Sequence, residues 1–148
     1  EAGLEIMELV AAPLAAARAV LNKRQRELGV LALDLGGGTA NMTVFEEGDI
    51  IYLYVLPIGS AHITSDLAIG LRSSLDVAER VKLEYGSALI EEISKKEMID
   101  LSKLGLDGEG VVPRRQVVQI IEARLSEILE LNNKNLKKIG RQGLLPAG

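Results

Sequence analysis

The segment with the clearest chemical character is Asp34-Leu-Gly-Gly-Gly-Thr39, which directly follows a short apolar run. Three consecutive glycines let the backbone turn tightly and approach a ligand with no Cβ in the way. Successive backbone N–H groups in such a turn suit an anion such as a phosphate, and Thr39 adds a hydroxyl donor. Asp34 is placed to hold a magnesium ion through water or to orient an attacking water.

The same residues also have a plainer interpretation. Three glycines after a strand form an ordinary hairpin or bulge in many proteins, and an aspartate beside them is a common turn former. Two familiar nucleotide motifs are excluded, because no Gly-Lys-Ser/Thr follows the glycines and because a strand rather than a helix is predicted next.

Three strands are predicted around this segment. The apolar run 29–35 fits a buried strand, and residues 39–46 alternate as a half-buried strand does. A turn signal follows with Gly48-Asp49 at its tip, and residues 50–57 return as a third strand. We therefore expect an antiparallel three-stranded meander with the glycines in its first turn.

Helices are predicted on both sides of the meander. Pro13 opens an Ala-rich helix over residues 15–21, and apolar residues at helical spacing predict another over residues 60–71. Ser74 caps a following helix that ends before Gly86. A long amphipathic helix is expected over residues 115–138.

Four segments have less regular patterns. Residues 4–10 alternate as a short strand does, and residues 22–27 fit a solvated charged loop or a helix end. The stretch 87–103 fits strands or a mixture of strand and helix. The glycine-rich stretch 105–113 is typical of a hairpin or loop.

The composition is that of an ordinary globular chain of 148 residues, 47% hydrophobic and 26% charged, which is enough apolar material to bury a core. A net charge of −4 and an aromatic content of 3% argue against nucleic-acid binding, because phosphates attract basic surfaces and bases stack on aromatic rings. The absence of cysteine fits a reducing cytoplasm. No apolar run reaches the length of about 18 residues that a membrane span needs.

The order of the segments resembles the superfamily of actin, hexokinase and the heat-shock chaperones. The Asp34 to Thr39 motif, followed by a hairpin, is similar to that superfamily's second phosphate motif, and residues 78–88 resemble its adenosine-contacting helix. Two further stretches, 57–66 (Pro-Ile-Gly-Ser-Ala-His-Ile-Thr-Ser-Asp) and 139–148 (Ile-Gly-Arg-Gln-Gly-Leu-Leu-Pro-Ala-Gly), resemble the FtsA family of bacterial cell-division proteins.

This resemblance implies an α/β fold, namely the actin-like (ribonuclease H-like) mixed sheet with flanking helices. Residues 1–86 would form subdomain IIA with the phosphate motif. Residues 87–148 would form part of an incomplete second subdomain, IIB, with the long amphipathic helix. Because the chain starts with Glu1 rather than Met, we expect a fragment of a longer protein, without the family's first phosphate hairpin, adenosine loop and membrane-targeting helix.

The resemblance also implies a site for ATP and Mg²⁺. The residues that would cradle the β- and γ-phosphates are Gly36, Gly37, Gly38 and Thr39. Asp34 would bind the magnesium ion through water. It would also lie beside the attacking water, as a catalytic residue. Glu79 and Lys82 would reach the ribose and adenine, since residues three apart share one helix face. The alternative for this pair is an exposed ion pair with no ligand role.

A second implied site lies on the long helix. Arg114, Arg115 and Arg124 fall where FtsA proteins dock the acidic C-terminal tail of the tubulin-like protein FtsZ, and Arg124, in Ile-Glu-Ala-Arg, matches best. A guanidinium binds a carboxylate through two parallel hydrogen bonds. For Arg114 and Arg115 the alternative is a solvated helix face.

Two departures from the family pattern bear on activity. Asn41 stands where many relatives carry an aspartate, which removes a carboxylate near the metal and argues against strong hydrolysis. Ser60 replaces the second of two glycines after the meander.

His62, the one histidine, is expected to be a cap or packing residue rather than a catalytic base. The parent protein resembles a weak ATPase, and the isolated chain is expected to be inactive, because positioning supplies most of phosphoryl-transfer catalysis.

We therefore expect a fragment of an FtsA-like, ATP-binding protein that links FtsZ filaments to the membrane in bacterial cell division. The resemblance implies self-association into actin-like filaments and a cytoplasmic protein on the inner face of the membrane. The alternative is another actin-like ATPase, similar to the rod-shape protein MreB, the pilus-assembly protein PilM or a heat-shock chaperone.

Overall fold

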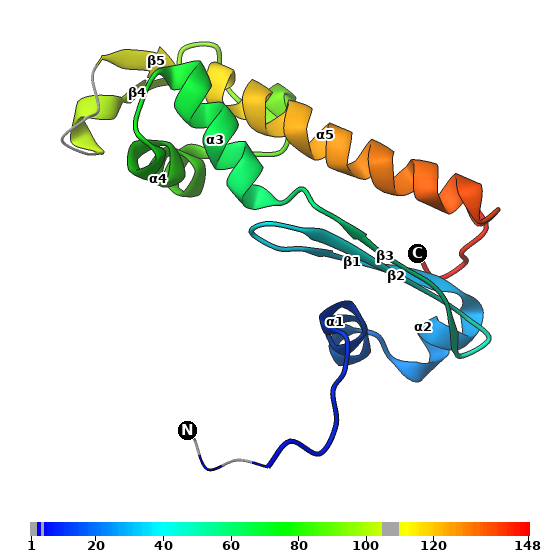
Figure 1. Cartoon of the computed structure of the whole chain (residues 1–148). Coiled ribbons are helices and arrows are strands. Elements are labelled where there is room, and N and C mark those ends of the chain that lie inside the picture. The colour runs from blue at the N-terminus through cyan, green and yellow to red at the C-terminus, as the bar shows by residue number, and fades with distance from the viewer. Residues whose placement is uncertain (1–2, 4, 105–109) are drawn as a thin grey trace.

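The structure, a computed structural model, describes residues 3, 5–104 and 110–148. Its centre is an antiparallel sheet of β1 (Val30–Leu35), β2 (Ala40–Glu46) and β3 (Asp49–Leu56), in that order (Figure 1). This confirms the predicted meander. The turn between β2 and β3 is centred one residue earlier than predicted, on Glu47 and Gly48, whose φ angles are 54° and 89°. Positive φ at both central residues is the mark of the tight hairpin turn that matches strand twist.

One face of the sheet is covered by α1 (Ala12–Val20), which carries Pro13 in its first turn as predicted. Ala17 of this helix packs against Val30 and Phe45 of the sheet. Thr43 is buried on the same face and its hydroxyl donates to the Pro13 carbonyl at 3.2 Å. A buried hydroxyl needs such a partner, so this bond helps to fix α1 on the sheet.

A short helix, α2 (Lys23–Leu28), forms where the sequence predicts a charged loop or a helix end. The reason is a capping box between Asn22 and Gln25. The Gln25 N–H donates to Asn22 Oδ1 and the Asn22 N–H donates to Gln25 Oε1, each at 2.9 Å. Two N–H groups that a helix start leaves free are thereby satisfied.

The strand predicted over residues 4–10 is wrong for residues 5–10, which form no strand, and residue 4 lies outside the described residues. A strand needs a neighbouring strand for its backbone hydrogen bonds. No segment in the described ranges pairs with residues 5–10, and Ile6 and Leu9 are 75% and 87% exposed. Alternating residue types are therefore not sufficient for a strand here.

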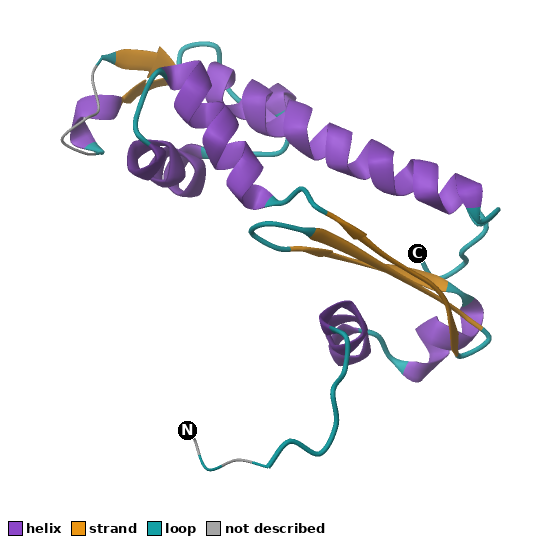
Figure 2. Cartoon of the chain, in the orientation of Figure 1, coloured by secondary structure: helices purple, strands orange, loops and turns teal. Residues whose placement is uncertain are grey.

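The opposite face of the sheet is covered by the C-terminal half of α5 (Arg114–Lys138), the long helix predicted over residues 115–138 (Figure 2). Ile128 of α5 packs against Ala40 and Leu56 of the sheet. Across the described residues, no helix combines the length and the apolar character needed to cross a membrane.

The N-terminal half of α5 packs on α3 (Ser60–Leu71) and α4 (Leu75–Tyr85), which confirms both predicted helices. Ser74 caps α4 by accepting from the Val77 N–H at 3.4 Å, and Gly86 follows the last turn. The three helices share one apolar core that includes Leu67, Val81 and Val117.

A small antiparallel pair of strands, β4 (Met98–Asp100) and β5 (Val111–Pro113), borders this core. Single turns of 3₁₀ helix, η1 (Ile90–Glu92) and η2 (Leu101–Lys103), accompany β4, so the mixed strand and helix prediction for residues 87–103 is confirmed. The predicted hairpin or loop over residues 105–113 falls outside the described residues except at 110–113. The predicted subdomain division near residue 86 stays a prediction.

Candidate functional site

The glycine segment forms the turn between β1 and β2. The Gly36 N–H donates to the Thr39 carbonyl at 2.8 Å and closes the turn. Within the described part of the chain, the N–H groups of Gly37, Gly38 and Thr39 make no hydrogen bond to the backbone. A turn with unused N–H groups is able to accept an anion.

The carbonyl groups of the same turn are bound by the start of α3. The Ser60 N–H donates to the Gly36 carbonyl at 2.9 Å, and the Ala61 N–H donates to the Gly37 carbonyl at 2.8 Å. This contact requires glycine at position 59, because a Cβ there would lie 2.5 Å from both carbonyl oxygens. The first turn of α3 therefore holds the carbonyl side of the glycine turn.

His62 belongs to this junction. The Gly59 N–H donates to His62 Nδ1 at 3.1 Å, so the imidazole caps the start of α3. This confirms the cap role expected for His62. Ser60, which replaces a glycine of the family pattern, uses its backbone rather than its side chain in the contact with Gly36.

Asp34 and Asn41 are direct partners across β1 and β2, and Asn41 Nδ2 donates to Asp34 Oδ2 at 3.2 Å. No group of three or more His, Cys, Asp or Glu side chains among the described residues is arranged to hold a metal ion. Mg²⁺ in nucleotide sites keeps several water ligands and takes others from phosphates. A single carboxylate beside the turn therefore fits a magnesium ion bound through water.

A cavity of about 410 Å³ opens beside the glycine turn, between α3 and α4. Gly37 lines it from the turn, Thr64 lines it from α3, and Glu79 and Lys82 line it from α4. The structure thus brings three of the residues predicted from the sequence to one cavity. Asp34 instead lines a separate cavity of about 160 Å³ between β1 and α1.

Glu79 and Lys82 are paired at the wall of this cavity. Lys82 Nζ lies 2.6 Å from Glu79 Oε2, and the lysine side chain is 15% exposed against 43% for the glutamate. The Thr64 hydroxyl also donates to Glu79 Oε2. The hydrogen bond from Lys82, followed by that from Thr64, lowers the pKa of Glu79 below its ordinary value. Glu79 and Lys82 therefore form an ion pair and both line the cavity, and their contact with a ligand stays a prediction.

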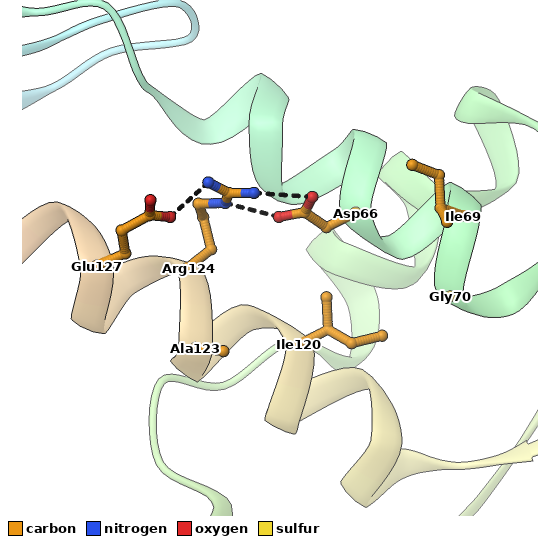
Figure 3. Close-up of a pocket in the computed structure, with 7 residues that line it drawn as sticks. All are labelled: Asp66, Ile69, Gly70, Ile120, Ala123, Arg124 and Glu127. Atoms are coloured by element: carbon orange, nitrogen blue, oxygen red, sulfur yellow. Dashed lines mark hydrogen bonds and ion pairs between the residues drawn. The ribbon is translucent and has the colours of Figure 1, made fainter.

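A second cavity, of about 350 Å³, lies between α3 and α5 (Figure 3). Arg124 crosses it to Asp66, with Nε to Oδ2 at 2.7 Å and Nη2 to Oδ1 at 3.0 Å, and also donates to Glu127. These carboxylates, Asp66 first, raise the pKa of Arg124 above its ordinary value. Ile69 and Ile120 give the cavity apolar walls. We call this cavity the α3–α5 groove.

Arg114 and Arg115 lie at the start of α5 and bind the protein itself. Arg114 donates to the Tyr85 carbonyl at 2.9 Å and to Glu97 at 2.7 Å. Arg115 donates to the Ile93 carbonyl at 2.8 Å. Neither side chain lines the α3–α5 groove. The structure therefore does not bring these two arginines together with Arg124.

Two residues of these cavities, Thr64 and Asp66, have no role in the sequence prediction. Both lie on α3 within the stretch 57–66 that carries the family resemblance. The sequence holds a signal for Thr64, because this hydroxyl residue stands beside Ile63 and three residues before Leu67 in the predicted helix. The structure shows that Thr64 is only 7% exposed. A buried hydroxyl requires a hydrogen-bond partner. The sequence does not reveal that the partners come from α4.

Comparison with protein families gives a match over most of this chain. The family model described as "Cell division protein FtsA" matches residues 31–144. The FtsA proteins of Bacillus subtilis (strain 168) and Escherichia coli (strain K12) are 39% and 32% identical, over 94% and 96% of this chain. The chain covers 32% and 35% of those proteins, so it spans about a third of their length.

Solved structures share the fold. MreB 5 of Spiroplasma citri bound to AMPPNP superimposes with a TM-score of 0.65 and 23% identity, over 85% of this chain and 40% of that one. The ethanolamine utilization protein EutJ from Carboxydothermus hydrogenoformans superimposes with a TM-score of 0.59 and 21% identity, over 86% of this chain and 36% of that one. The chain therefore forms part of an actin-like fold, and the predicted fold class is confirmed.

Proposed function

Because this chain belongs to the FtsA family of cell division proteins, we propose that it is part of an ATP-binding, actin-like protein that links FtsZ filaments to the membrane. The observation that carries ATP binding is the cavity between the glycine turn and α4, lined by Gly37, Glu79 and Lys82. The structures of MreB 5, which share the fold, are bound to AMPPNP and ADP.

The proposed roles follow from the chemistry of each group. The unused N–H groups of the glycine turn receive phosphate oxygens, and Asp34 holds Mg²⁺ through water. Glu79, kept ionised by its neighbours, accepts from a ribose hydroxyl. Lys82 supplies a positive charge at the same wall of the cavity. Hydrolysis is weak, because Asn41 rather than a carboxylate faces Asp34.

Nuclear magnetic resonance of the labelled chain tests ATP binding. We expect millimolar Mg-ATP to shift the amide signals of Gly36, Gly37, Gly38 and Thr39 together with those around Glu79 and Lys82. The Lys82→Ala variant, which removes the positive charge, should require several-fold more ATP for the same shifts. The absence of shifts at the glycine turn at about 10 mM ATP, roughly ten times the upper end of the usual range of KM values, would count against the proposal.

A second function is favoured by the α3–α5 groove. Its apolar walls and its guanidinium group fit a short acidic peptide with apolar side chains, and we propose that the C-terminal tail of FtsZ docks there. Filament formation and attachment to the inner face of the membrane belong to the whole protein and remain part of the same proposal.

The MreB-like, PilM-like and chaperone-like alternatives are not proposed, since the family model matches FtsA.

Titration of a fluorescent FtsZ tail peptide into the chain tests the docking role. Arg124→Glu should abolish saturable binding, because it replaces the guanidinium that lines the groove with a third carboxylate beside Asp66 and Glu127. Arg80→Glu is the matched control, since Arg80 lies on α4 and pairs on the surface with Glu84. Binding that survives Arg124→Glu, in a chain that remains folded, would refute docking at this groove.

A further inference from the structure

We propose that Thr64 is a positioning residue, which holds Glu79 and Lys82 against the cavity and ties both of them to the glycine turn. This inference rests on the proposed function, because it concerns the same ATP cavity. It assigns a role to a residue on α3 rather than on α4 or the turn.

The hydroxyl of Thr64 bonds to both members of the ion pair. Its oxygen accepts from Lys82 Nζ at 2.8 Å, and its hydrogen is donated to Glu79 Oε2. A hydroxyl has one hydrogen to donate and two lone pairs to accept with. The Ser60 carbonyl is the other possible acceptor for that hydrogen. At 3.3 Å it lies farther from the Thr64 hydroxyl oxygen than Glu79 Oε2 does. In the observed arrangement Thr64 is therefore the donor to one side chain of the pair and the acceptor from the other.

The same network reaches the glycine turn through Ser60. Lys82 Nζ donates to the Ser60 carbonyl at 3.4 Å, while the Ser60 N–H donates to the Gly36 carbonyl at 2.9 Å. A continuous series of hydrogen bonds thus runs from Glu79 on α4, through Thr64 and Lys82, to the turn between β1 and β2. The two walls of the cavity are connected by these bonds.

Thr64 matters because its partners are long side chains, of which Glu79 is 43% exposed. Glutamate and lysine have several rotamers each, and fixing them costs conformational entropy when a ligand binds. An ion pair three residues apart on a helix contributes little by itself to holding one geometry. A buried threonine, 7% exposed, has few rotamers and is fixed by α3. It therefore orders both side chains before a ligand arrives, which favours binding.

Hydroxyl replacement in the complete 148-residue chain tests this role. Thr64→Val removes the hydroxyl and keeps the shape, Thr64→Ala removes it and leaves space for water, and Thr64→Ser retains it. Ser65→Ala is the matched control, because Ser65 lines the same cavity but its hydroxyl donates to the Ala61 carbonyl instead. Two quantities are measured for each variant: the Mg-ATP affinity from amide shifts, and the pKa of the Glu79 carboxyl from carbon-13 shifts without nucleotide.

We expect Thr64→Val and Thr64→Ala to weaken Mg-ATP binding about tenfold, the usual effect of a lost hydrogen bond to a charged group. Thr64→Ser and Ser65→Ala should stay within about threefold of the unchanged chain. In the two hydroxyl deletions the pKa of Glu79 should rise part of the way to its ordinary value, because Lys82 remains. A merely structural role would lower stability without moving this pKa.

The outcomes separate this inference from the proposed function. Unchanged ATP affinity in both hydroxyl deletions would overturn the positioning role and leave the ATP site standing. If the unchanged chain shows no ATP binding, the proposed function fails. The Glu79 titration then decides the inference. If the pKa of Glu79 is unchanged in Thr64→Val and Thr64→Ala, the inference is overturned. If this pKa rises in both variants but not in Thr64→Ser, the inference is supported.

Discussion

Arg124 and Asp66 are joined by two hydrogen bonds although 58 residues separate them in the sequence. The pair connects α5 to α3 across the groove (Figure 3). Their side chains are 25% and 29% exposed, so neither charge is fully hydrated. The pair has two consequences, one for stability and one for binding.

Arg124→Ala should lower the free energy of unfolding by about 1 to 2 kcal/mol, because it leaves Asp66 half-buried without its cation. Urea unfolding followed by circular dichroism measures the change. Arg80→Ala is the control, since Arg80 and Glu84 form an exposed pair on α4; its effect should be below about 0.5 kcal/mol. Equal effects of the two substitutions would contradict a structural role for the Arg124–Asp66 pair.

Asp66→Asn should strengthen the binding of an acidic tail peptide about threefold, because a partner's carboxylate then competes at Arg124 with Glu127 alone rather than with two carboxylates. Fluorescence anisotropy of the labelled peptide provides the measurement, at low and high salt. Weaker binding in Asp66→Asn would mean that the ligand needs Asp66 itself, for example to bind a basic side chain.

Gly59→Ala and Gly37→Ala should separate structure from ligand binding at the turn. A Cβ on Gly59 meets two carbonyl oxygens at 2.5 Å, so this variant should lose at least about 2 kcal/mol. A Cβ on Gly37 meets nothing within 4 Å, so stability should change by less than about 0.5 kcal/mol. Because Gly37 lines the ATP cavity, the second variant should still bind Mg-ATP more weakly.

Thermal or urea unfolding of both glycine variants, with ATP titrations beside them, checks this prediction. A stable Gly59→Ala chain would mean that the start of α3 does not need its close contact with the turn. Full ATP affinity in Gly37→Ala would remove the turn from the proposed site.

Stability should fall in acid partly because of Glu79. Its pKa is lower in the folded chain than the ordinary value of 4.5. The stabilisation that Glu79 contributes is therefore complete above the ordinary value and is lost as the pH falls through the lowered pKa. Urea midpoints measured from about pH 6 to about pH 3 should fall less steeply for Glu79→Gln than for the unchanged chain. Identical slopes would show that Glu79 does not contribute.

The sequence is sufficient to predict the parts of the fold that local patterns determine. Residues 60–71 have apolar positions at helical spacing, and α3 has those bounds. The meander follows from one apolar run, one alternating run and the turn residues. Residues 5–10 also alternate, but a strand depends on a neighbour for its hydrogen bonds, and no local pattern reveals that neighbour.

The candidate site is predicted only in part for the same reason. The glycine turn and the Glu79–Lys82 spacing are visible in the sequence, because each lies within a few residues. Thr64 lies 15 residues from Glu79 and becomes its partner only when α3 and α4 pack together. The family resemblance indicates a role for Arg124, but not that the protein's own Asp66 occupies its guanidinium group.

Helix α3 is a part common to both cavities. Its first residues bind the glycine turn, and Asp66 and Ile69 further along it form a wall of the α3–α5 groove. The helix has 12 residues and is therefore about 18 Å long, short enough to move as a stiff rod. Any displacement that tilts this rod at the turn also displaces its other end, so the geometry of one cavity is mechanically tied to that of the other.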